Sequence, residues 1–560
     1  MAEANFTESQ RRSKRVVRAT VVRALLPATA PAFFIVTTIV GAVRWFSPVP
    51  FWDMWDGTLQ FYVARLQGAH WSPFFEQANE HRIVLSKVLF WADYRFFGGL
   101  SYLLIFLNIV LMFCLWMSLC LAARALMGAH RRLAYLCCAL VAVPCFSWLQ
   151  SENINWGYQS PFYLAYLLPL VALLMMARWI HDRRNVWFVA ATVCGVLSTV
   201  TMANGLLALP LLVLMLALSG ESTRWRTATL LLVTVLTLAA WTYHYHTMPH
   251  AGAPFRIMVK FLLMFFGAPF GWLFHNEIVT MLVGATVISA SIWLALQWGR
   301  RVTRDPSYLA LALFVVYIGA AGAAATISRS NFGLGAALAG RYETSLMLLY
   351  SALLLLFVHL YRERVATLAV VGAISVFVPL MLFAAQLGTM DQSGPEIARE
   401  RMQAALALDL GVDDRDTIGS VYPQHTAEQR AQIWRVVANA VRYNLSVFGS
   451  SELKTARALL GKPPVGLKEC RGNIDAEAPV VSDTGHVRLS GWVFDEATKQ
   501  VPKSAYIVSN GMVVGSVLTG IDRPDVQQSI DSKARHSGFQ GYAVKADVHN
   551  YSIFCKGSFP

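Results

Sequence analysis

Apolar runs alternate with short basic clusters along the first two thirds of the chain. Each run is about 17 to 25 residues long, the length that a helix needs to cross the hydrocarbon core of a bilayer. We therefore predict a polytopic α-helical membrane protein of about eleven transmembrane helices within residues 28–385. The runs lie near residues 28–46, 101–123, 133–150, 161–178, 186–201, 205–219, 227–246, 278–297, 307–326, 343–361 and 365–385.

Arginines gather in every second turn between the runs and in the tail before the first run. The positive-inside rule places such segments in the cytoplasm, so residues 1–27 are expected to form a cytoplasmic tail ahead of a retained first helix. This alternation of cytoplasmic and external turns holds only if residues 257–274 do not cross fully but lie in the interface or re-enter. Gly267, Pro269 and Gly271 interrupt that stretch, which favours such an arrangement. The C-terminal part after residue 385 is then extracytoplasmic.

Two further domains are predicted after the last run. Residues 386–469 are polar with helical spacing of their apolar residues, which predicts an extracytoplasmic helical subdomain. From residue 470 the pattern changes to short alternating runs with a Ser509-Asn510-Gly511 turn, which predicts a β-sandwich module over residues 470–560. Cys470 and Cys555 bracket this module, and in an oxidising compartment we expect them to form a disulfide.

The composition agrees with a membrane protein and limits the classes of molecule that the protein is expected to bind. Of the 560 residues, 56% are hydrophobic and 14% are charged, and the mean hydropathy is +0.47, which exceeds what a soluble core needs. The net charge of +14 lies in clusters between apolar runs, so it indicates topology and not a nucleic-acid partner. No nucleotide-binding loop, zinc-ligand spacing or serine-hydrolase motif occurs. We predict no cofactor and no metal site, although the sequence leaves a divalent metal open.

The first external loop, residues 47–100, carries two acids just past the first apolar run. Asp53 and Asp56 would face the same way at the start of a helix predicted over residues 57–67, where they could share a site. Carboxylates at the end of a membrane helix cost free energy and are usually kept for a function, so we interpret both as catalytic candidates. The alternative is that one of them only caps the helix. A second helix near residues 83–97 is expected to lie along the membrane surface.

The same loop returns to the membrane through Glu80, His81 and Arg82. The planar fork of an arginine suits a phosphate, and a histidine can donate or accept a proton near neutral pH. We predict that these three residues bind substrate. The alternative is an arginine that snorkels to the interface beside a carboxylate.

Two more external loops hold residues that suit substrate binding. Arg329 and Arg341, with Tyr342, lie between the ninth and tenth runs and break the basic-inside pattern, so they are expected to hold the phosphate of a lipid-linked substrate. An accident of topology is the alternative. Trp156 and Gln159, after the third run, suit either sugar stacking or an aromatic belt.

These motifs resemble those of the GT-C superfamily of polytopic membrane glycosyltransferases, which use sugars linked to polyprenyl phosphate. In that superfamily a catalytic aspartate lies in the first external loop, and aligning this chain on Gly68 gives that place to Asp53. The frequent Asp-Glu pair of the family is Asp53-Met54 here, so a second acid must be Asp56 or Glu80. Arg341-Tyr342 is similar to an Arg-Tyr element of bacterial members, and residues 491–495 resemble a β-sandwich module appended to bacterial glycan enzymes.

The resemblance implies a function for the chain in cell-envelope polysaccharide biosynthesis. A sugar would pass with inversion from a carrier such as undecaprenyl phosphate to a glycan or lipid acceptor, at the periplasmic face of the inner (cytoplasmic) membrane. Arg82, Arg329 and Arg341 would hold the phosphate, and Asp53 would act as general base. Two rival functions stay open: a polymerase or ligase that uses polyprenyl-diphosphate-linked glycans, and a carrier-lipid flippase or transporter.

Overall fold

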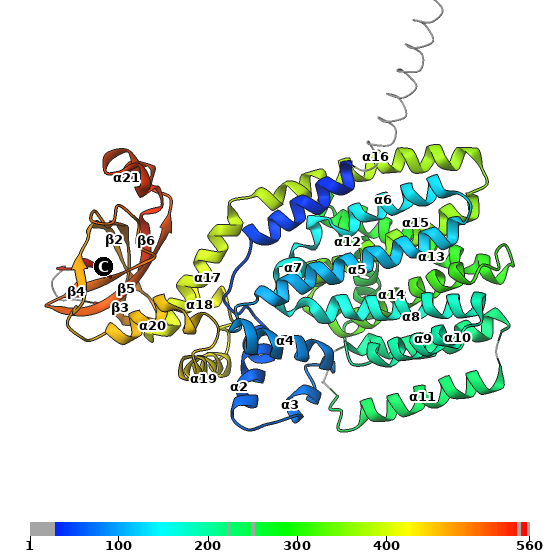
Figure 1. The fold of residues 1–560 in the computed structure, drawn as a ribbon, viewed down its shortest axis with the longest axis horizontal. Helices are drawn as coiled ribbons and strands as arrows, with labels where there is room; N and C mark the ends of the chain where they lie inside the picture. Colours follow the sequence, from blue (N-terminus) through cyan, green and yellow to red (C-terminus); the bar gives the residue numbers. More distant parts are fainter. Residues whose placement is uncertain (1–28, 222, 248–251, 546–549, 557–560) are drawn as a thin grey trace, which may run out of the picture. The chain divides into compact units, whose positions relative to one another are not determined.

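A computed structural model describes residues 29–221, 223–247, 252–545 and 550–556. The chain divides into two compact units, whose elements Figure 1 shows in chain order. We call residues 29–44, 74–88 and 104–391 the helix unit, and residues 45–73, 89–103 and 392–560 the sheet unit. The predicted basic tail, residues 1–27, lies outside the described residues.

The helix unit is a bundle of apolar helices, and each of the eleven predicted runs is helical. Within the described residues nine helices are long and apolar enough to cross a membrane, and three shorter apolar helices, Thr29–Arg44, Asn185–Ser198 and Ala203–Ser219, accompany them. A polytopic helical fold is thereby confirmed. The helices are α5 (Tyr102–Met127), α6 (Arg131–Cys145), α7 (Ser151–Asn155), α8 (Ser160–Asp182), α9 (Asn185–Ser198), α10 (Ala208–Ser219), α11 (Arg224–Thr242), α12 (Phe255–Phe274), α13 (Glu277–Gly299), α14 (Pro306–Arg329), α15 (Glu343–Tyr361) and α16 (Val365–Leu387).

Most of the arginine-bearing turns of the helix unit lie at one end of the bundle, which we call the basic end. There Arg226, at the start of α11, donates to the Oδ1 of Asn185 at 3.1 Å. Thr303, between α13 and α14, lies 3.1 Å from the Nε2 of His359 near the end of α15. The opposite end, which we call the loop end, holds Glu80 to Arg82 together with the ends of α11 and α14. The arrangement agrees with the predicted alternation of basic and external turns.

The predicted break at residues 267–271 is wrong, because α12 is one continuous helix with Pro269 inside it. Small residues serve close packing here: a Cβ on Gly267 would lie 1.9 Å from the carbonyl oxygen of Thr280, and a Cβ on Gly284 would lie 1.9 Å from that of Leu263. Helix α12 is also long enough to span. Even so, α11 ends at the loop end and α13 runs to the basic end, so the segment between them returns to the end that it left.

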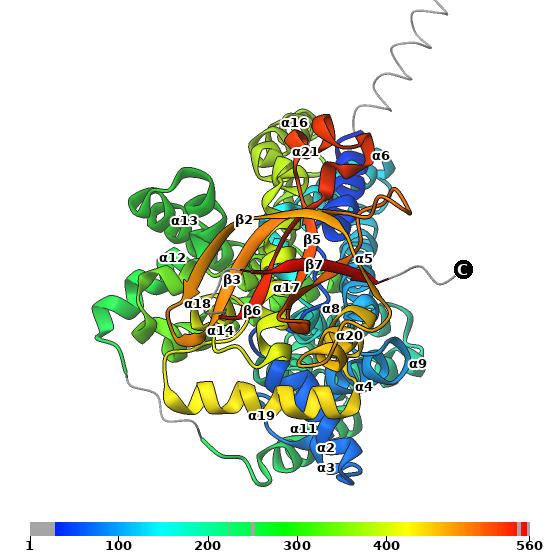
Figure 2. The ribbon, with the colours of Figure 1, turned by 90° about the vertical axis from the view of Figure 1, so that its left-hand side faces the viewer.

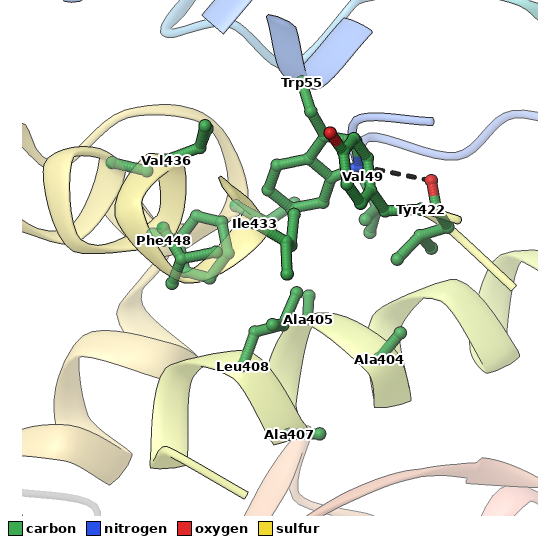
Figure 3. Close-up of a cluster of buried hydrophobic side chains, with 14 of the residues drawn as sticks. Val49, Trp55, Ala404, Ala405, Ala407, Leu408, Tyr422, Ile433, Val436 and Phe448 are labelled. Carbon is green, nitrogen blue, oxygen red and sulfur yellow. Dashed lines mark hydrogen bonds between the residues drawn. The ribbon is translucent and has the colours of Figure 1, made fainter. Parts of the chain in front are cut away.

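In the sheet unit, the loop at residues 47–100 and the segment after residue 392 share one hydrophobic core. Fully buried Trp55 and Leu59 pack in one cluster with Leu406, Val436 and Phe448. Figure 3 shows Trp55 reaching between the helices that carry these residues. The helices of this core are η1 (Trp55–Gln60), α2 (Phe61–Leu66), α17 (Ser393–Leu410), α18 (Arg415–Gly419), α19 (Ala427–Tyr443) and α20 (Ser451–Leu459), while α3 (Ser72–Phe75) and α4 (Val84–Phe97) complete the loop.

The C-terminal strands form one seven-stranded antiparallel sheet in the order β1-β7-β4-β5-β6-β3-β2, which agrees with a C-terminal β domain, whereas the sandwich arrangement stays a prediction. One face buries its own core around Phe539, and Tyr506 packs in a separate cluster with Ala456 of α20. Cys470 and Cys555 form a disulfide with a Cα–Cα distance of 5.8 Å. The strands, seen in Figure 2, are β1 (Leu467–Glu469), β2 (Arg471–Val480), β3 (Asp483–Phe494), β4 (Ser504–Ser509), β5 (Met512–Ile521), β6 (Gly538–Val544) and β7 (Ser552–Lys556), with α21 (Pro524–Ser529) after β5.

The hairpin between β4 and β5 turns where the sequence predicts it. Asn510 and Gly511 both have positive φ, 50° and 73°, which is the backbone that a two-residue type I′ turn needs. Asparagine and glycine tolerate this conformation better than other residues, so the local sequence fixes the turn.

Candidate functional site

Asp53 and Asp56 lie at the start of η1 in the sheet unit, and both are exposed. The N-cap position belongs to Met54, without a side-chain cap. Asp56 lies inside η1 and therefore does not cap it, whereas the capping alternative for Asp53 stays open. Asp56 instead accepts two hydrogen bonds at 3.1 Å, from the phenol of Tyr422 on Oδ2 and from the Nε2 of Gln432 on Oδ1. Each carboxylate oxygen thus has its own donor, which orients the group.

The backbone just before the acids is held in an uncommon conformation. Trp52 has a φ of 48°, a left-handed value that is rare for a bulky side chain. The amide of Trp52 donates to the carbonyl of Val421 at 2.8 Å, and the indole of Trp55 donates to the same carbonyl at 3.2 Å. These bonds tie the acid-bearing turn to the segment between α18 and α19. Strain of this kind is frequent at functional sites.

Tyr422 is the common neighbour of the two acids. Burial, together with the nearby Asp56 and Asp53 carboxylates, raises the pKa of Tyr422 above its usual range. The phenol therefore stays protonated and keeps its role as donor. Gln432, the second donor to Asp56, in turn accepts a hydrogen bond from the Nη2 of Arg435 at 2.6 Å. We call Asp53, Asp56, Tyr422 and Gln432 the acid site.

A second polar group lies at the loop end of the helix unit. Arg329, the last residue of α14, donates from Nη2 to both carboxylate oxygens of Glu80, at 3.2 and 3.1 Å. Both side chains are partly buried, with 31% of Arg329 and 16% of Glu80 exposed. The ion pair joins the returning loop to the end of a membrane helix, and it neutralises a cation that the sequence assigns to phosphate binding.

His81 follows Glu80 and accepts a hydrogen bond on Nδ1 from the backbone amide of Ala203 at 3.2 Å. The other ring nitrogen must then carry the proton, so Nε2 is a donor. Burial lowers the pKa of His81 to about 4, against the opposing charge of Glu80 and with the help of Arg329. The imidazole is therefore neutral at physiological pH.

Arg82 has a structural role that the sequence does not reveal. Its Nε donates to the carbonyl of Trp241 at 2.9 Å, Nη1 to that of Phe75 at 2.7 Å, and Nη2 to that of Tyr243 at 2.5 Å. All three nitrogens are thus engaged by backbone oxygens. The fork that was predicted to hold a phosphate instead fastens the returning loop to the end of α11.

Arg341 differs from Arg329 and Arg82 because its guanidinium makes no hydrogen bond or ion pair among the described residues. Its Cζ lies 5.6 Å from the ring centroid of Tyr342. Its backbone is fixed on both sides, since the amide donates to the Oε2 of Glu152 at 3.0 Å and the carbonyl accepts from Asn153 at 3.0 Å. The backbone of Arg341 is therefore fixed, while the N–H groups of its guanidinium remain available as hydrogen-bond donors.

The predicted sugar contacts lie beside this segment. Trp156 is buried, with 8% exposed, and its ring centroid is 6.0 Å from that of Tyr158. Gln159 is fully buried, and neither atom of its amide has a hydrogen-bond partner within the described residues. Asn108 of α5 donates to the carbonyl of Trp156 at 3.0 Å. Unpaired buried amides are costly, so Gln159 is suited to a polar ligand.

The structure brings Glu80, His81 and Arg329 together, and it places Arg341 and Tyr342 against Glu152 and Asn153. The acid site belongs to the other compact unit. Sequence reasoning missed Tyr422, Gln432 and Glu343. Glu343, the first residue of α15, is fully buried, and within the described chain neither of its carboxylate oxygens has a hydrogen-bond partner. Glu343 could have been noticed in the sequence as an acid at the start of an apolar run, whereas no sequence pattern points to Gln432.

Among the described residues no three histidine, cysteine or acidic side chains gather in a way that could hold a metal ion. No known protein family matches this chain, and a search of curated proteins finds no similar protein.

Proposed function

We propose that the protein is a membrane glycosyltransferase that moves a sugar from a polyprenyl-phosphate carrier to a glycan or lipid acceptor of the cell envelope, with inversion. The observation that carries the proposal is the acid site. An exposed aspartate, Asp53, stands beside a second one, Asp56, that two donors hold in place. Both follow directly after an apolar helix, where a membrane-bound donor and a water-soluble acceptor can meet.

Asp53 is the general base in this proposal. Its carboxylate takes the proton from an acceptor hydroxyl while that oxygen attacks the anomeric carbon and the bond from carbon to the carrier phosphate breaks. Asp56 cannot turn freely, because each of its oxygens already accepts a hydrogen bond. We assign it the task of positioning the turn that carries Asp53 and of binding an acceptor or sugar hydroxyl.

The leaving phosphate gains negative charge, and arginine is the residue that best stabilises it. Arg341 is the stronger candidate, because no carboxylate of the described residues lies within ion-pair distance of its guanidinium and its backbone is fixed by Glu152 and Asn153. Arg329 must compete with Glu80 for a phosphate. Arg82 is occupied by three carbonyls, so we no longer give it a phosphate.

Aromatic and amide groups near Arg341 suit the sugar. The Trp156 and Tyr158 rings offer apolar faces, and the unpaired amide of buried Gln159 offers both a donor and an acceptor. Sugars are recognised by this combination of stacking and directed hydrogen bonds. His81, which is neutral and donates from Nε2, adds a further polar group at the same end of the helix unit.

The decisive experiment is transfer by purified protein in lipid nanodiscs. A panel of polyprenyl-phosphate sugars is supplied, and release of polyprenyl phosphate is measured. We expect Asp53→Asn to abolish release while the protein still folds, and Glu428→Gln, an exposed acid on α19, to behave as wild type. Transfer at a near wild-type rate by Asp53→Asn would refute the role of this residue.

The same assay separates the rival functions. Release of a polyprenyl diphosphate from diphosphate-linked glycans would favour a polymerase or ligase. Movement of the carrier lipid between leaflets without release of phosphate would favour a flippase. Neither rival requires an acid directly after the first helix, so an inactive Asp53→Asn variant with an active Glu428→Gln control supports the transferase.

A further inference from the structure

Arg401 on α17 lies in the sheet unit and stacks on Phe51, two residues before Asp53. The Cζ of its guanidinium is 3.9 Å from the centroid of the Phe51 ring. Burial lowers the pKa of Arg401 to about 10, against the opposing charge of Glu400, so the group is still a cation at neutral pH. A partly desolvated charge therefore lies next to the turn that carries the catalytic candidate.

The guanidinium of Arg401 makes no hydrogen bond or ion pair within the described part of the chain. Several other arginines of this unit pair with carboxylates, whereas Arg95 and Arg442 resemble Arg401 in lying over an aromatic ring. Contact with an aromatic face partly compensates a buried cation, but it does not satisfy the N–H groups at the edge of the guanidinium plane. The paired arginines are Arg415, Arg457, Arg471, Arg488, Arg523 and Arg535.

We propose that Arg401, backed by Phe51, is an anion-binding site that holds a carboxylate or phosphate group of the substrate handled by the acid site. A planar fork with five N–H donors matches the two oxygens of such a group, and stacking on a ring fixes its plane in advance. The link to the substrate rests on the proposed function. The anion comes either from the phosphate of the lipid carrier or from an acidic sugar in the acceptor.

Binding is measured on the full-length protein in nanodiscs by tryptophan fluorescence. Trp52 is 46% exposed and its ring centroid lies 6.1 Å from that of Phe51, which makes it a local reporter. The Trp52→Phe protein identifies the part of the signal that comes from this position. The two probes are undecaprenyl phosphate and an oligosaccharide ending in glucuronic acid.

We expect Arg401→Gln to weaken binding of one probe at least tenfold. Arg401→Lys, which keeps the charge but loses the planar fork, should have an intermediate effect. Arg399→Gln, two residues away on the same helix, should bind as wild type. A loss confined to undecaprenyl phosphate assigns the site to the carrier, and a loss confined to the acidic sugar assigns it to the acceptor.

Two results would overturn the site: wild-type protein that binds neither probe, or a folded Arg401→Gln protein that binds both as tightly as wild type. The cation would then serve only to pack Phe51 on α17. Should Arg401→Gln fail to fold, an unchanged affinity of Arg401→Lys for both probes overturns the proposal instead. Binding is measured without turnover, so failure of sugar transfer and failure of this site give different results.

Discussion

The phenol of Tyr422 donates a hydrogen bond of 3.1 Å to Asp56, a residue 366 positions earlier in the chain. This bond makes the segment between α18 and α19 part of the acid site. The side-chain amide of Gln432, from α19, completes the arrangement at the other oxygen of Asp56. The helical subdomain after residue 392 is thus more than a spacer between the membrane helices and the sheet.

Replacing Tyr422 by phenylalanine should slow sugar transfer while the fold persists. The change removes one hydrogen bond to a charged group and keeps the ring, and such bonds contribute about 1.5 to 3 kcal/mol. We expect kcat to fall about tenfold or more, with little change in the KM for the donor. Tyr443→Phe, at the end of α19, is the matched control. An unchanged kcat for Tyr422→Phe would remove Tyr422 from the site.

Neutralising Glu80 should improve donor binding if Arg329 holds a phosphate. Glu80 occupies the Nη2 of Arg329 at 3.1 Å, so Glu80→Gln leaves the cation without its competing anion. We expect a several-fold lower KM for the polyprenyl-phosphate donor, and a higher KM for Arg329→Gln. Glu76→Gln, an exposed acid of the same loop, is the control. A raised KM for Glu80→Gln would show that the ion pair has a structural task.

The stability of the helix unit should fall in mild acid because of His81. Its pKa is lowered by burial to about 4 in the folded protein, whereas an unfolded histidine titrates near 6.5. Between these values the unfolded chain binds more protons, so this contribution is complete above about pH 6.5 and is lost as pH falls towards 4. Melting temperatures from pH 7 to 4 measure the slope.

His81→Asn should flatten that slope, because asparagine can still accept from Ala203 but does not titrate. His425→Asn, an exposed histidine in the sheet unit, should leave the slope as in wild type. Equal slopes in wild type and His81→Asn would assign the acid sensitivity to other groups.

Adding a methyl group at Gly267 should destabilise the α12–α13 pair. A Cβ there would meet the carbonyl oxygen of Thr280 at 1.9 Å, so the helices must move apart, and overpacking of this kind costs about 1 to 3 kcal/mol or more. Gly319→Ala in α14 is the control, since a Cβ there meets no atom within 4 Å. The expected result is a lower melting temperature for Gly267→Ala alone.

Hydropathy predicted the apolar helices of the helix unit other than α12, because the length of an apolar run can be read from residues that are adjacent in the chain. It erred at residues 267–271, where glycine and proline were interpreted as a break. In a bundle of apolar helices, a glycine instead allows another backbone to approach, and its reason lies on the partner helix. The order of the strands likewise depends on pairing between residues far apart in the chain, whereas the β4–β5 turn could be predicted from Asn510 and Gly511.

The site shows the same limit. Asp53 and Asp56 were found from their place after the first helix. The partners of Asp56 were not, because Tyr422 and Gln432 have no local signal. Arg82 was predicted to bind a phosphate. The groups that it contacts are backbone carbonyls, such as that of Trp241, and a sequence does not show which carbonyls a side chain will meet. Residues that act through backbone groups are the hardest to interpret from sequence alone.

The shared core around Trp55 also constrains how the chain threads the bilayer. One hydrophobic core cannot be split between two compartments, so the chain that leaves it near residue 103 and comes back at residue 392 crosses an even number of times. Eleven apolar helices of the described chain, α5, α6, α8, α9, α10, α11, α12, α13, α14, α15 and α16, lie between those points. An even number of crossings therefore requires that at least one of these eleven helices does not cross the bilayer.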